Sequence, residues 1–532
     1  MKLYIRMVGL LSALLLTVGL ASGCGGNSDT SSGSGSTTSS KTSSSTGSST
    51  SSSPDASTNS SGDASTDSSS DASTGPNSTP NSNTSTSSNT NNNKPPVSTE
   101  RKLYDDTVEN MGGYEFVIAN PWMNREAPDN AGLVERMYHQ RFDEVEKQYN
   151  CKIRITDFYG GMEALMPRIM AGDKVADLLK MLPEMWTPAA GAGFLRPWND
   201  VADIVNFYDT RWIQTHLNTT LNGKNYIMEF ERPAEGGATV LWYNRDVLKA
   251  AGIKDDPAQM AQKGTWTWDV FREMLQKITK ANANRYGLGW ADVYADPGRA
   301  LAISNGAKAI TEGSNGKLTT TYTDSKYLAA MNFFNQIVNV DKTMKIYPNM
   351  KKEETWGNMP AVQTLFSSFE KGLIGFISGR IWYGTNFKQM EGLDYGLVVY
   401  PKGPSASKYM TYAQTLQGYA MTRTNPDYVK TAKIFRAISR PIEDYAKDMT
   451  AYDEDTTAEF FMDGDNLSRQ MMKLAADNGV IDLGYNVRTL GDALNVAQYG
   501  SIFWGTQTVD AAFQAIAGAY DKDVQDAFAK LP

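Results

Sequence analysis

Apolar residues recur at strand-like and helix-like spacings from about residue 114 to the end of the chain. Residues 114–120 and 151–155 have the composition of buried strands, and residues 131–149 between them have the spacing of a helix with one apolar side. The apolar positions of that side are Val134, Met137, Phe142 and Val145. This β-loop-α-β order predicts a parallel sheet.

The next segments continue the alternation. Residues 162–170 read as a helix and residues 175–179 as a short buried strand, followed by Pro183-Glu184-Met185-Trp186. Residues 236–244 then form a β-branched and aromatic run, entered through a glycine pair and left through Asn-Arg-Asp. We interpret this run as a strand, the start of a helix, and the first crossing of the chain between two lobes. Ligand sites favour such domain interfaces.

The N-terminus has a different pattern. A positive start, a short apolar run and small residues make residues 1–23 a secretory signal. The run is shorter than the ~18 to 20 residues of a spanning helix. The small residues directly before Cys24 resemble a bacterial lipobox, which implies a lipoprotein whose first mature residue, Cys24, carries fatty acyl (palmitate) chains. We therefore expect attachment to the outer face of a cell membrane of the Gram-positive kind.

Residues 24–100 are a linker after the lipidated cysteine. This segment is almost wholly Ser, Thr, Asn, Gly, Asp and Pro, and it cannot bury enough apolar surface to offset chain entropy, so we predict disorder. Its root-mean-square reach as a flexible tether is roughly 50 Å.

Size, charge and cysteine usage limit the remaining part. The residues after 100 are too many for a single core and suit two lobes of ~200 residues. The formal charge of -8 and the pI near 5.2 argue against a nucleic-acid partner. Cys151 has no disulfide partner once Cys24 is acylated. His139 and His216, interpreted as surface residues, make no zinc site or triad, and we predict no metal and no cofactor.

Short motifs then follow one another in a characteristic order. They are Gly193-Phe194-Leu195-Arg196-Pro197, Trp242-Tyr243-Asn244-Arg245-Asp246, Ala251-Gly252-Ile253, Thr265-Trp266-Thr267-Trp268, residues 369–382, and Ser501-Ile502-Phe503-Trp504 at a helix start. This order resembles the bacterial extracellular solute-binding proteins of ABC importers, particularly the carbohydrate-binding branch with its maltose- and oligosaccharide-binding proteins. Ala176 and Arg245 depart from the family pattern, which typically has Pro and Lys there.

The resemblance implies a periplasmic-binding-protein-like α/β fold of the type II kind, with two lobes, a three-segment hinge and the ligand in the cleft. We expect crossings near Gly236, residues 412–420 and residues 478–490. The first lobe would then comprise residues 101–235 and 418–480, and the second residues 236–417 and 481–532. The implied partners are a carbohydrate and the transmembrane permease subunits, and we expect a monomer.

A sugar site needs flat aromatic rings for C–H faces and amide or carboxylate groups for hydroxyls. The candidates lie in loops or helix starts expected at the cleft. They are Trp122, Glu184, Trp186, Glu235, Trp290, Asp292, Tyr294, Trp382, Tyr383 and Trp504. Trp198, Trp266 and Trp268 are expected in the core, and Trp242 beneath the hinge.

Two other functions stay open. A wall-anchored glycan-cleaving enzyme would need paired carboxylates ~5 to 9.5 Å apart, such as Asp292 with Glu184 or Glu235. The same fold could also bind a peptide or organic anion, or present ligand to a signalling partner, and an arginine-lined cleft would favour the anion. Of these, the sequence favours a binding protein without enzymatic activity.

Overall fold

A computed structural model of the chain describes residues 108–129, 131–156, 161–207, 213–230, 237–279, 284–345, 359–413 and 416–531. The predicted signal segment, Cys24, the linker and Glu235 lie outside these residues. The described chain contains two five-stranded sheets with helices packed on them. No described helix has both the length and the apolar character needed to span a membrane.

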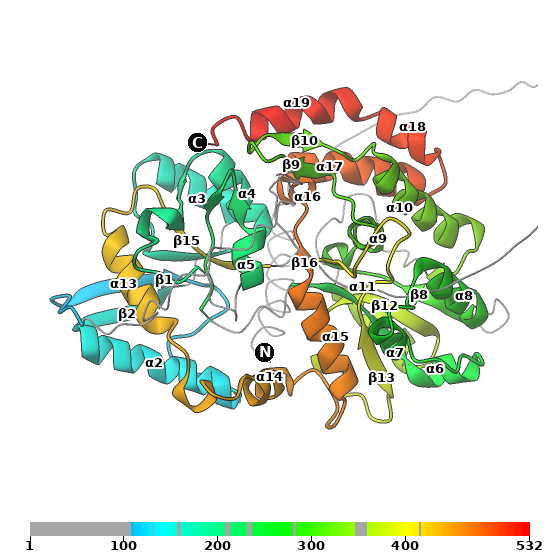
Figure 1. Cartoon of the computed structure of the whole chain (residues 1–532), viewed down its shortest axis with the longest axis horizontal. Helices are drawn as coiled ribbons and strands as arrows, with labels where there is room; N and C mark the ends of the chain where they lie inside the picture. The colour runs from blue at the N-terminus through cyan, green and yellow to red at the C-terminus, as the bar shows by residue number, and fades with distance from the viewer. Residues whose placement is uncertain are drawn as a thin grey trace, which may run out of the picture. The chain divides into compact units, whose positions relative to one another are not determined.

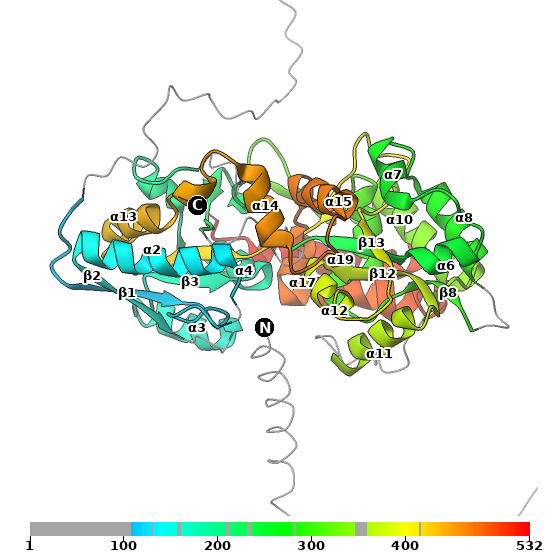
Figure 2. The ribbon, with the colours of Figure 1, turned by 90° about the horizontal axis from the view of Figure 1, so that it is seen from below.

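The first lobe is built on a sheet with the strand order β2-β1-β3-β15-β4. The strands are β1 (Tyr114–Ala119), β2 (Cys151–Thr156), β3 (Leu178–Met181), β4 (Leu195–Arg196) and β15 (Gly418–Thr422). β1 pairs in parallel with β2 and β3, as the sequence predicts, whereas β15 is antiparallel to β3 and β4. The helices α2 (Leu133–Tyr149) and α13 (Tyr428–Ile438) cover one face and α3 (Gly161–Met170) the other (Figure 2).

β3 starts three residues later than the sequence predicts. Val175 has a φ of 63°, a left-handed conformation that strands do not contain. Asp177 then accepts hydrogen bonds from the Tyr114 hydroxyl, the Val117 N–H and the Thr431 hydroxyl. The segment before Leu178 therefore ties β1 to α13 instead of pairing in the sheet.

Helix α4 (Pro183–Gly191) follows β3 directly and completes this part of the lobe. The remaining elements of the segment are short. They are η1 (Trp198–Val201), α5 (Ile213–Asn218), β5 (Thr220–Leu221) and β6 (Lys224–Asn225). Trp198 is fully buried as predicted, and its indole N–H donates to the Tyr419 carbonyl at 3.0 Å.

The second lobe has the strand order β11-β8-β12-β7-β13. The strands are β7 (Thr239–Asn244), β8 (Tyr286–Gly289), β11 (Met344–Lys345), β12 (Ile374–Arg380) and β13 (Tyr395–Val398). The strand and helix start predicted within residues 236–244 are confirmed from Thr239 onward. Every residue of β7 is buried, and Asn244 caps α6 by accepting from the Val247 N–H. Trp242, Trp266 and Trp268 are buried, as expected.

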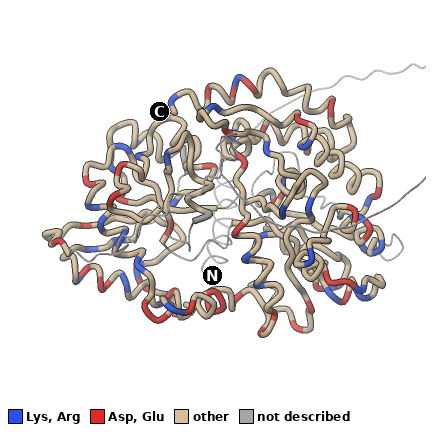
Figure 3. Tube along the Cα trace, viewed as in Figure 1, with Lys and Arg blue, Asp and Glu red and all other residues tan. Residues whose placement is uncertain are grey.

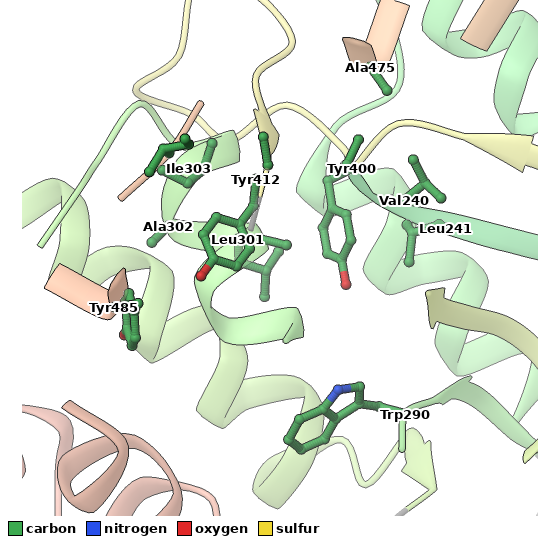
Figure 4. Packing of buried hydrophobic residues seen from close by; sticks show 14 of the residues in the cluster. Val240, Leu241, Trp290, Leu301, Ala302, Ile303, Tyr400, Tyr412, Ala475 and Tyr485 are labelled. Carbon is green, nitrogen blue, oxygen red and sulfur yellow. The ribbon is translucent and has the colours of Figure 1, made fainter. Parts of the chain in front are cut away.

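Helices surround this second sheet (Figure 1). They are α6 (Arg245–Ala250), α7 (Pro257–Gln262), α8 (Trp268–Ile278), α9 (Pro297–Ser304), α10 (Ser325–Asn335), η4 (Gln336–Val340), α11 (Met359–Glu370), η5 (Ile381–Tyr383) and α12 (Gly384–Phe387). A hairpin of β9 (Ile310–Glu312) and β10 (Leu318–Thr320) is antiparallel. Figure 4 shows how Leu301, Tyr400 and Tyr412 from separate segments meet in the core of the lobe.

The chain passes between the two sheets more than once, and one helix lies in a different lobe from the expected one. Met228 bridges to Tyr419 in the first sheet and Thr239 begins a strand of the second, so the first passage falls between them. β14 (Thr411–Tyr412) precedes the return to β15 and pairs in parallel with β16 (Gly479–Val480). The expectation that residues 418–480 belong to the first lobe is wrong for α15 (Asn466–Asp477). This helix packs against β13 and α7, and its Ser468 hydroxyl accepts from the Leu397 N–H at 3.0 Å.

The last part of the chain packs on the second lobe and also contacts α4 of the first. It comprises α16 (Leu483–Asn486), α17 (Arg488–Ala497), η7 (Gln498–Ile502), α18 (Val509–Gln514) and α19 (Ala517–Ala527). Two short helices, η6 (Glu443–Tyr445) and α14 (Met449–Thr457), lie between α13 and α15. Figure 3 shows Lys, Arg, Asp and Glu interspersed along the helices of both lobes.

Candidate functional site

The first part of the candidate site is the start of α4. This helix begins just after β3, which ends at Met181. Pro183 occupies the first helical turn, where its missing N–H costs no hydrogen bond. Glu184 follows in the same turn, where a carboxylate is favoured by the helix dipole. Burial nevertheless raises the pKa of Glu184 to about 7, while a backbone hydrogen bond, Tyr294 and Arg380 act in the opposite direction. Glu184 is therefore a carboxyl group that changes charge near neutral pH.

Tyr294 joins Glu184 from the other lobe. The Tyr294 hydroxyl donates to Glu184 Oε1 at 3.4 Å. Tyr294 is in η3 (Val293–Ala295), where its backbone N–H donates to Asp292 Oδ1 at 3.0 Å and its carbonyl accepts from the Thr239 hydroxyl at 3.2 Å. The backbone of Tyr294 is thus held by β7 and by the cap of its own helix, and its hydroxyl reaches α4 from the second lobe.

Asp292 organises the second-lobe side of the site. The side chain is fully buried, and its Oδ2 lies 2.7 Å from Arg380 Nε and accepts from the Tyr383 hydroxyl at 2.9 Å. Burial first, and then the negative charge of Asp292, hold the pKa of Tyr383 well above its ordinary value. Asp292 therefore holds the end of β12 and η5 against η3.

Arg380 stands between two aromatic rings. Its guanidinium carbon is 5.1 Å from the centroid of Tyr294 and 5.1 Å from that of Trp382, distances at which a cation is attracted to a ring face. Asp292 neutralises this cation, so ionised Glu184 leaves one net negative charge in the group and protonated Glu184 leaves none. Such a charge balance suits a neutral, polar ligand better than an anion.

The structure brings together five of the predicted site residues. The group contains Glu184, Asp292, Tyr294, Trp382 and Tyr383, with Arg380 added. Arg380 was missed by the sequence reasoning, although it stands two residues before Trp382 in a motif that pointed to the site. Its contact with Asp292 depends on the pairing of β12 beside η3, which residue spacing does not reveal.

The other predicted site residues that the structure describes are not part of this group. Trp186 and Trp290 are buried, and Trp290 stacks on Tyr499 with the ring centroids 5.0 Å apart. Trp122 and Trp504 are 39% and 52% exposed, and among the described residues neither makes a hydrogen bond or ring contact with the Glu184–Arg380 group. Trp504 follows η7, so the expectation that its motif opens a helix is wrong.

The histidines also differ from expectation. His139 and His216 are 7% and 5% exposed, so both are buried rather than surface residues. Their Nδ1 atoms contact the backbone carbonyls of Arg125 and Phe207. One nitrogen of each ring is therefore paired with the main chain, and within the described residues no cluster of three or more His, Cys, Asp or Glu side chains is arranged to hold a metal ion.

A surface hollow of about 300 Å³ lies at the opposite end of β7 from Thr239. Its lining residues include Asn244, Asp246, Arg285, Lys371 and Glu391. Asn244 ends the strand, and the mixed charges around it belong to the start of α6 and to loops beside β12 and β13. This hollow is separate from the group around Glu184 and Arg380.

The sequence profile of the bacterial extracellular solute-binding proteins matches residues 132–415, which is more than half of the chain. The chain belongs to this family. The matched region contains Glu184, Asp292, Tyr294, Arg380 and Trp382, whereas Trp504 lies beyond it. The family resemblance read from the motifs is thus confirmed.

Two curated proteins are similar to parts of the chain in sequence. The arabinooligosaccharide-binding protein of Bacillus subtilis is 26% identical over 240 residues, which are 43% of this chain and 50% of that protein. The chain therefore spans about half the length of this curated relative, and 43% of a binding protein of Brucella abortus.

Solved structures are similar in fold over more than three quarters of the chain. The sugar-binding protein MalE of Xanthomonas citri matches 79% of this chain and 98% of its own, with a TM-score of 0.55 at 14% identity. The ABC substrate-binding protein of Listeria monocytogenes in complex with cycloalternan matches 78% and 99%, with a TM-score of 0.53 at 15% identity. The expected periplasmic-binding-protein-like fold with two α/β lobes is confirmed.

Proposed function

We propose that this solute-binding protein captures a sugar or oligosaccharide outside the cell and delivers it unchanged to the membrane permease of an ABC importer. The family membership supports the receptor role, and the relatives named for arabinooligosaccharide, sugar and cycloalternan support a carbohydrate ligand. A lipid on Cys24 would keep the receptor at the outer membrane face, with residues 24–100 as its tether.

The observation that carries the ligand class is the unpaired oxygen of Glu184. Its Oε2 atom is inaccessible to solvent and accepts no hydrogen bond from any residue the structure describes, while Oε1 receives the Tyr294 hydroxyl. A buried oxygen without a donor is unfavourable by roughly 1–3 kcal/mol. A sugar hydroxyl supplies that donor, and the rings of Tyr294 and Trp382 offer faces for its C–H groups.

The remaining predicted residues would form a wider ligand surface. In this proposal Trp122 and Trp504 offer exposed ring faces, while the buried Trp290 and Tyr383 hold Asp292 by hydrogen bonds to its carbonyl and its carboxylate. Trp186 is buried in α4 beside Glu184. Glu235 would complete the surface from the passage between the lobes. Opening and closing of the lobes would admit and enclose the ligand.

The alternative functions fit the site less well. A glycan-cleaving enzyme would need Asp292 as a reactive carboxylate, but this side chain is fully buried and engaged by Arg380 and Tyr383. An anion receptor would need a cation without a counter-charge, whereas Arg380 lies 2.7 Å from Asp292. A non-catalytic receptor for a neutral ligand agrees with both contacts.

The direct test is calorimetry and thermal unfolding of the purified protein with a panel of unmodified oligosaccharides. We expect stoichiometric binding of at least one sugar and a raised melting temperature, because a ligand of the folded state stabilises it. Chromatography of the recovered sugar should show no product. Cleavage of any glycan, or binding confined to peptides or organic anions, would contradict the proposal.

The role of Glu184 is tested by Glu184→Gln beside the matched control Glu115→Gln. The amide keeps the shape of the side chain but presents a donor where one oxygen accepted, so sugar affinity should fall about tenfold or more. Glu115 is more than half exposed and pairs with Arg154, so its variant should bind like the parent. Equal affinities for all three proteins would remove Glu184 from the site.

The lipid anchor is tested separately by Cys24→Ser in the full chain. Cells should retain the parent protein in the membrane fraction and release the variant, and only the parent should incorporate labelled palmitate. Retention of the unlabelled variant would show that another segment holds the protein.

A further inference from the structure

The C-terminal end of α16 holds a buried amide without a partner. Asn486 is completely buried, and neither its Oδ1 nor its Nδ2 atom forms a hydrogen bond with any part of the chain that the structure describes. Native proteins pair nearly all buried polar atoms, and unpaired ones mark functional sites or missing partners. An amide with both ends unpaired needs one donor and one acceptor side by side.

The backbone around Asn486 is held firmly. Asp482 caps α16 by accepting from the Gly484 N–H at 3.0 Å, and its other oxygen accepts from the Ala309 N–H at 2.7 Å. A Cβ on Gly484 would stand 2.6 Å from the Tyr520 hydroxyl, so the helix lies too close to α19 to shift. The guanidinium of Arg299 stacks on Tyr485 at 3.7 Å. The amide is therefore pre-positioned rather than free to find a partner by moving.

The surface opposite α16 has the same shortage of partners. α16 contacts α17 and β9 and so belongs to the second lobe. It also packs against α4, which belongs to the first lobe. On α4 the Thr187 hydroxyl is completely buried and lacks any hydrogen-bond partner within the described residues. Thr187 lies three positions after Glu184 and so on the same face of the helix. The seam between α4 and α16 thus continues the site around Glu184.

We propose that this seam binds a pair of adjacent hydroxyl groups of the ligand, and that Asn486 selects for them. The inference rests on the proposed carbohydrate function. One ligand hydroxyl donates to Asn486 Oδ1 and its neighbour accepts from Nδ2, while Thr187 contributes a hydroxyl from α4. Because α4 and α16 belong to different lobes, separation of the lobes opens the seam and a ligand that fills it favours closure.

The selectivity follows from the two unpaired ends of one amide. A ligand that lacks either hydroxyl leaves one end buried and unpaired, and sites built for a hydroxyl reject analogues without it far more strongly than apolar pockets reject a missing methylene. A vicinal diol is therefore preferred over its monodeoxy analogues. Polyols and sugars carry such diols, whereas peptides do not.

The test is Asn486→Leu in the full chain, with Asn425→Leu as the matched control. Leucine has a similar shape but no polar atoms, so it removes an unpaired amide at Asn486 and should raise the melting temperature of the ligand-free protein. The same change should weaken binding of the sugar identified in the panel by about tenfold or more. A gain in stability together with a loss of affinity is a result that a purely structural residue would not give.

The control removes an amide that is already satisfied. Asn425 is completely buried, donates to the Thr431 hydroxyl at 3.0 Å and accepts from the Asp427 N–H at 2.9 Å. Its leucine variant should melt at a lower temperature and keep the parent affinity. Thr187→Val provides a second variant on the opposite helix, and it should behave like Asn486→Leu.

The results of these experiments distinguish a failure of the proposed carbohydrate function from a failure of the proposed hydroxyl site between α4 and α16. If the parent binds no sugar at all, the proposed function fails first. If the parent binds sugar and Asn486→Leu and Thr187→Val bind equally well, or if both variants melt below the parent, the seam is not a ligand site. Equal affinity of the parent for the diol and for its monodeoxy analogues would also overturn the inference.

Discussion

Replacing Asp292 with alanine should destabilise the second lobe strongly, because one carboxylate holds several groups there. Asp292 is fully buried, lies 2.7 Å from Arg380 Nε, and accepts from the Tyr383 hydroxyl and the Tyr294 N–H at 2.9 and 3.0 Å. The alanine variant leaves Arg380 without its counter-ion and Tyr383 without its acceptor. Both groups would remain in surroundings with little water.

The magnitude follows from these contacts. Removing one partner of a buried ion pair costs about 3–5 kcal/mol, and a buried hydroxyl without a partner costs roughly 1–3 kcal/mol. The two terms do not add fully, because the groups share one carboxylate. The Arg380 side chain keeps 18% of its surface exposed, so water partly replaces Asp292. We therefore expect a loss of about 3 kcal/mol in the free energy of unfolding.

The assay is urea unfolding of the full chain, followed by circular dichroism. Asp292→Ala, Arg380→Met and the double variant form a cycle, and the coupling between the two side chains should be about 2 kcal/mol because each single variant isolates the other group. Glu115→Ala breaks the ion pair with Arg154, whose side chains are 57% and 53% exposed, and should cost less than about 1 kcal/mol.

Two results would refute this reasoning. One is a loss for Asp292→Ala no larger than that of Glu115→Ala. The other is additivity in the cycle, which would show that Asp292 and Arg380 contribute independently. Either result would mean that the short contact between them does not organise the site.

Two further predictions concern α4. The pKa of Glu184 is raised to about 7 in the folded protein and lies near 4.5 without burial, so the folded state binds the extra proton between these values and its stability falls as pH rises from about 4.5 to 7. Over this pH range the parent should lose up to roughly 3 kcal/mol in the free energy of unfolding, and Glu184→Gln should not. Melting curves recorded at several pH values measure this difference. Parallel pH profiles of variant and parent would contradict the raised pKa of Glu184. Gly191→Ala should cost about 1–3 kcal/mol, because its Cβ would stand 2.6 Å from the Ala527 carbonyl oxygen, where the end of α19 meets α4. Gly518→Ala, with nothing within 4 Å of its Cβ, should leave the urea midpoint unchanged or slightly higher, and equal effects of the two substitutions would refute the contact.

The pattern of apolar residues was sufficient to predict a helix or strand where that pattern lies within one segment of the chain. The apolar spacing of residues 131–149 predicted α2, and the β-branched run before Asn244 predicted β7 and the capped start of α6. The pattern failed at Val175, where a left-handed residue delays β3, and at Trp504, which follows a helix instead of opening one. In both places the backbone conformation depends on neighbours that are distant in the sequence.

The sequence alone determined the solute-binding family and most of the succession of strands and helices, because both depend on composition or on the order of short motifs. The exported, tethered N-terminal segment stays a prediction. The tertiary structure decided that Arg380 neutralises Asp292, that Tyr294 reaches Glu184 from the other lobe, and that Asn486 is buried without a partner. The physical reason is that charge pairing and desolvation depend on distance in space. Residues 184, 292 and 380 come together only after the two sheets have formed and the chain has passed between them.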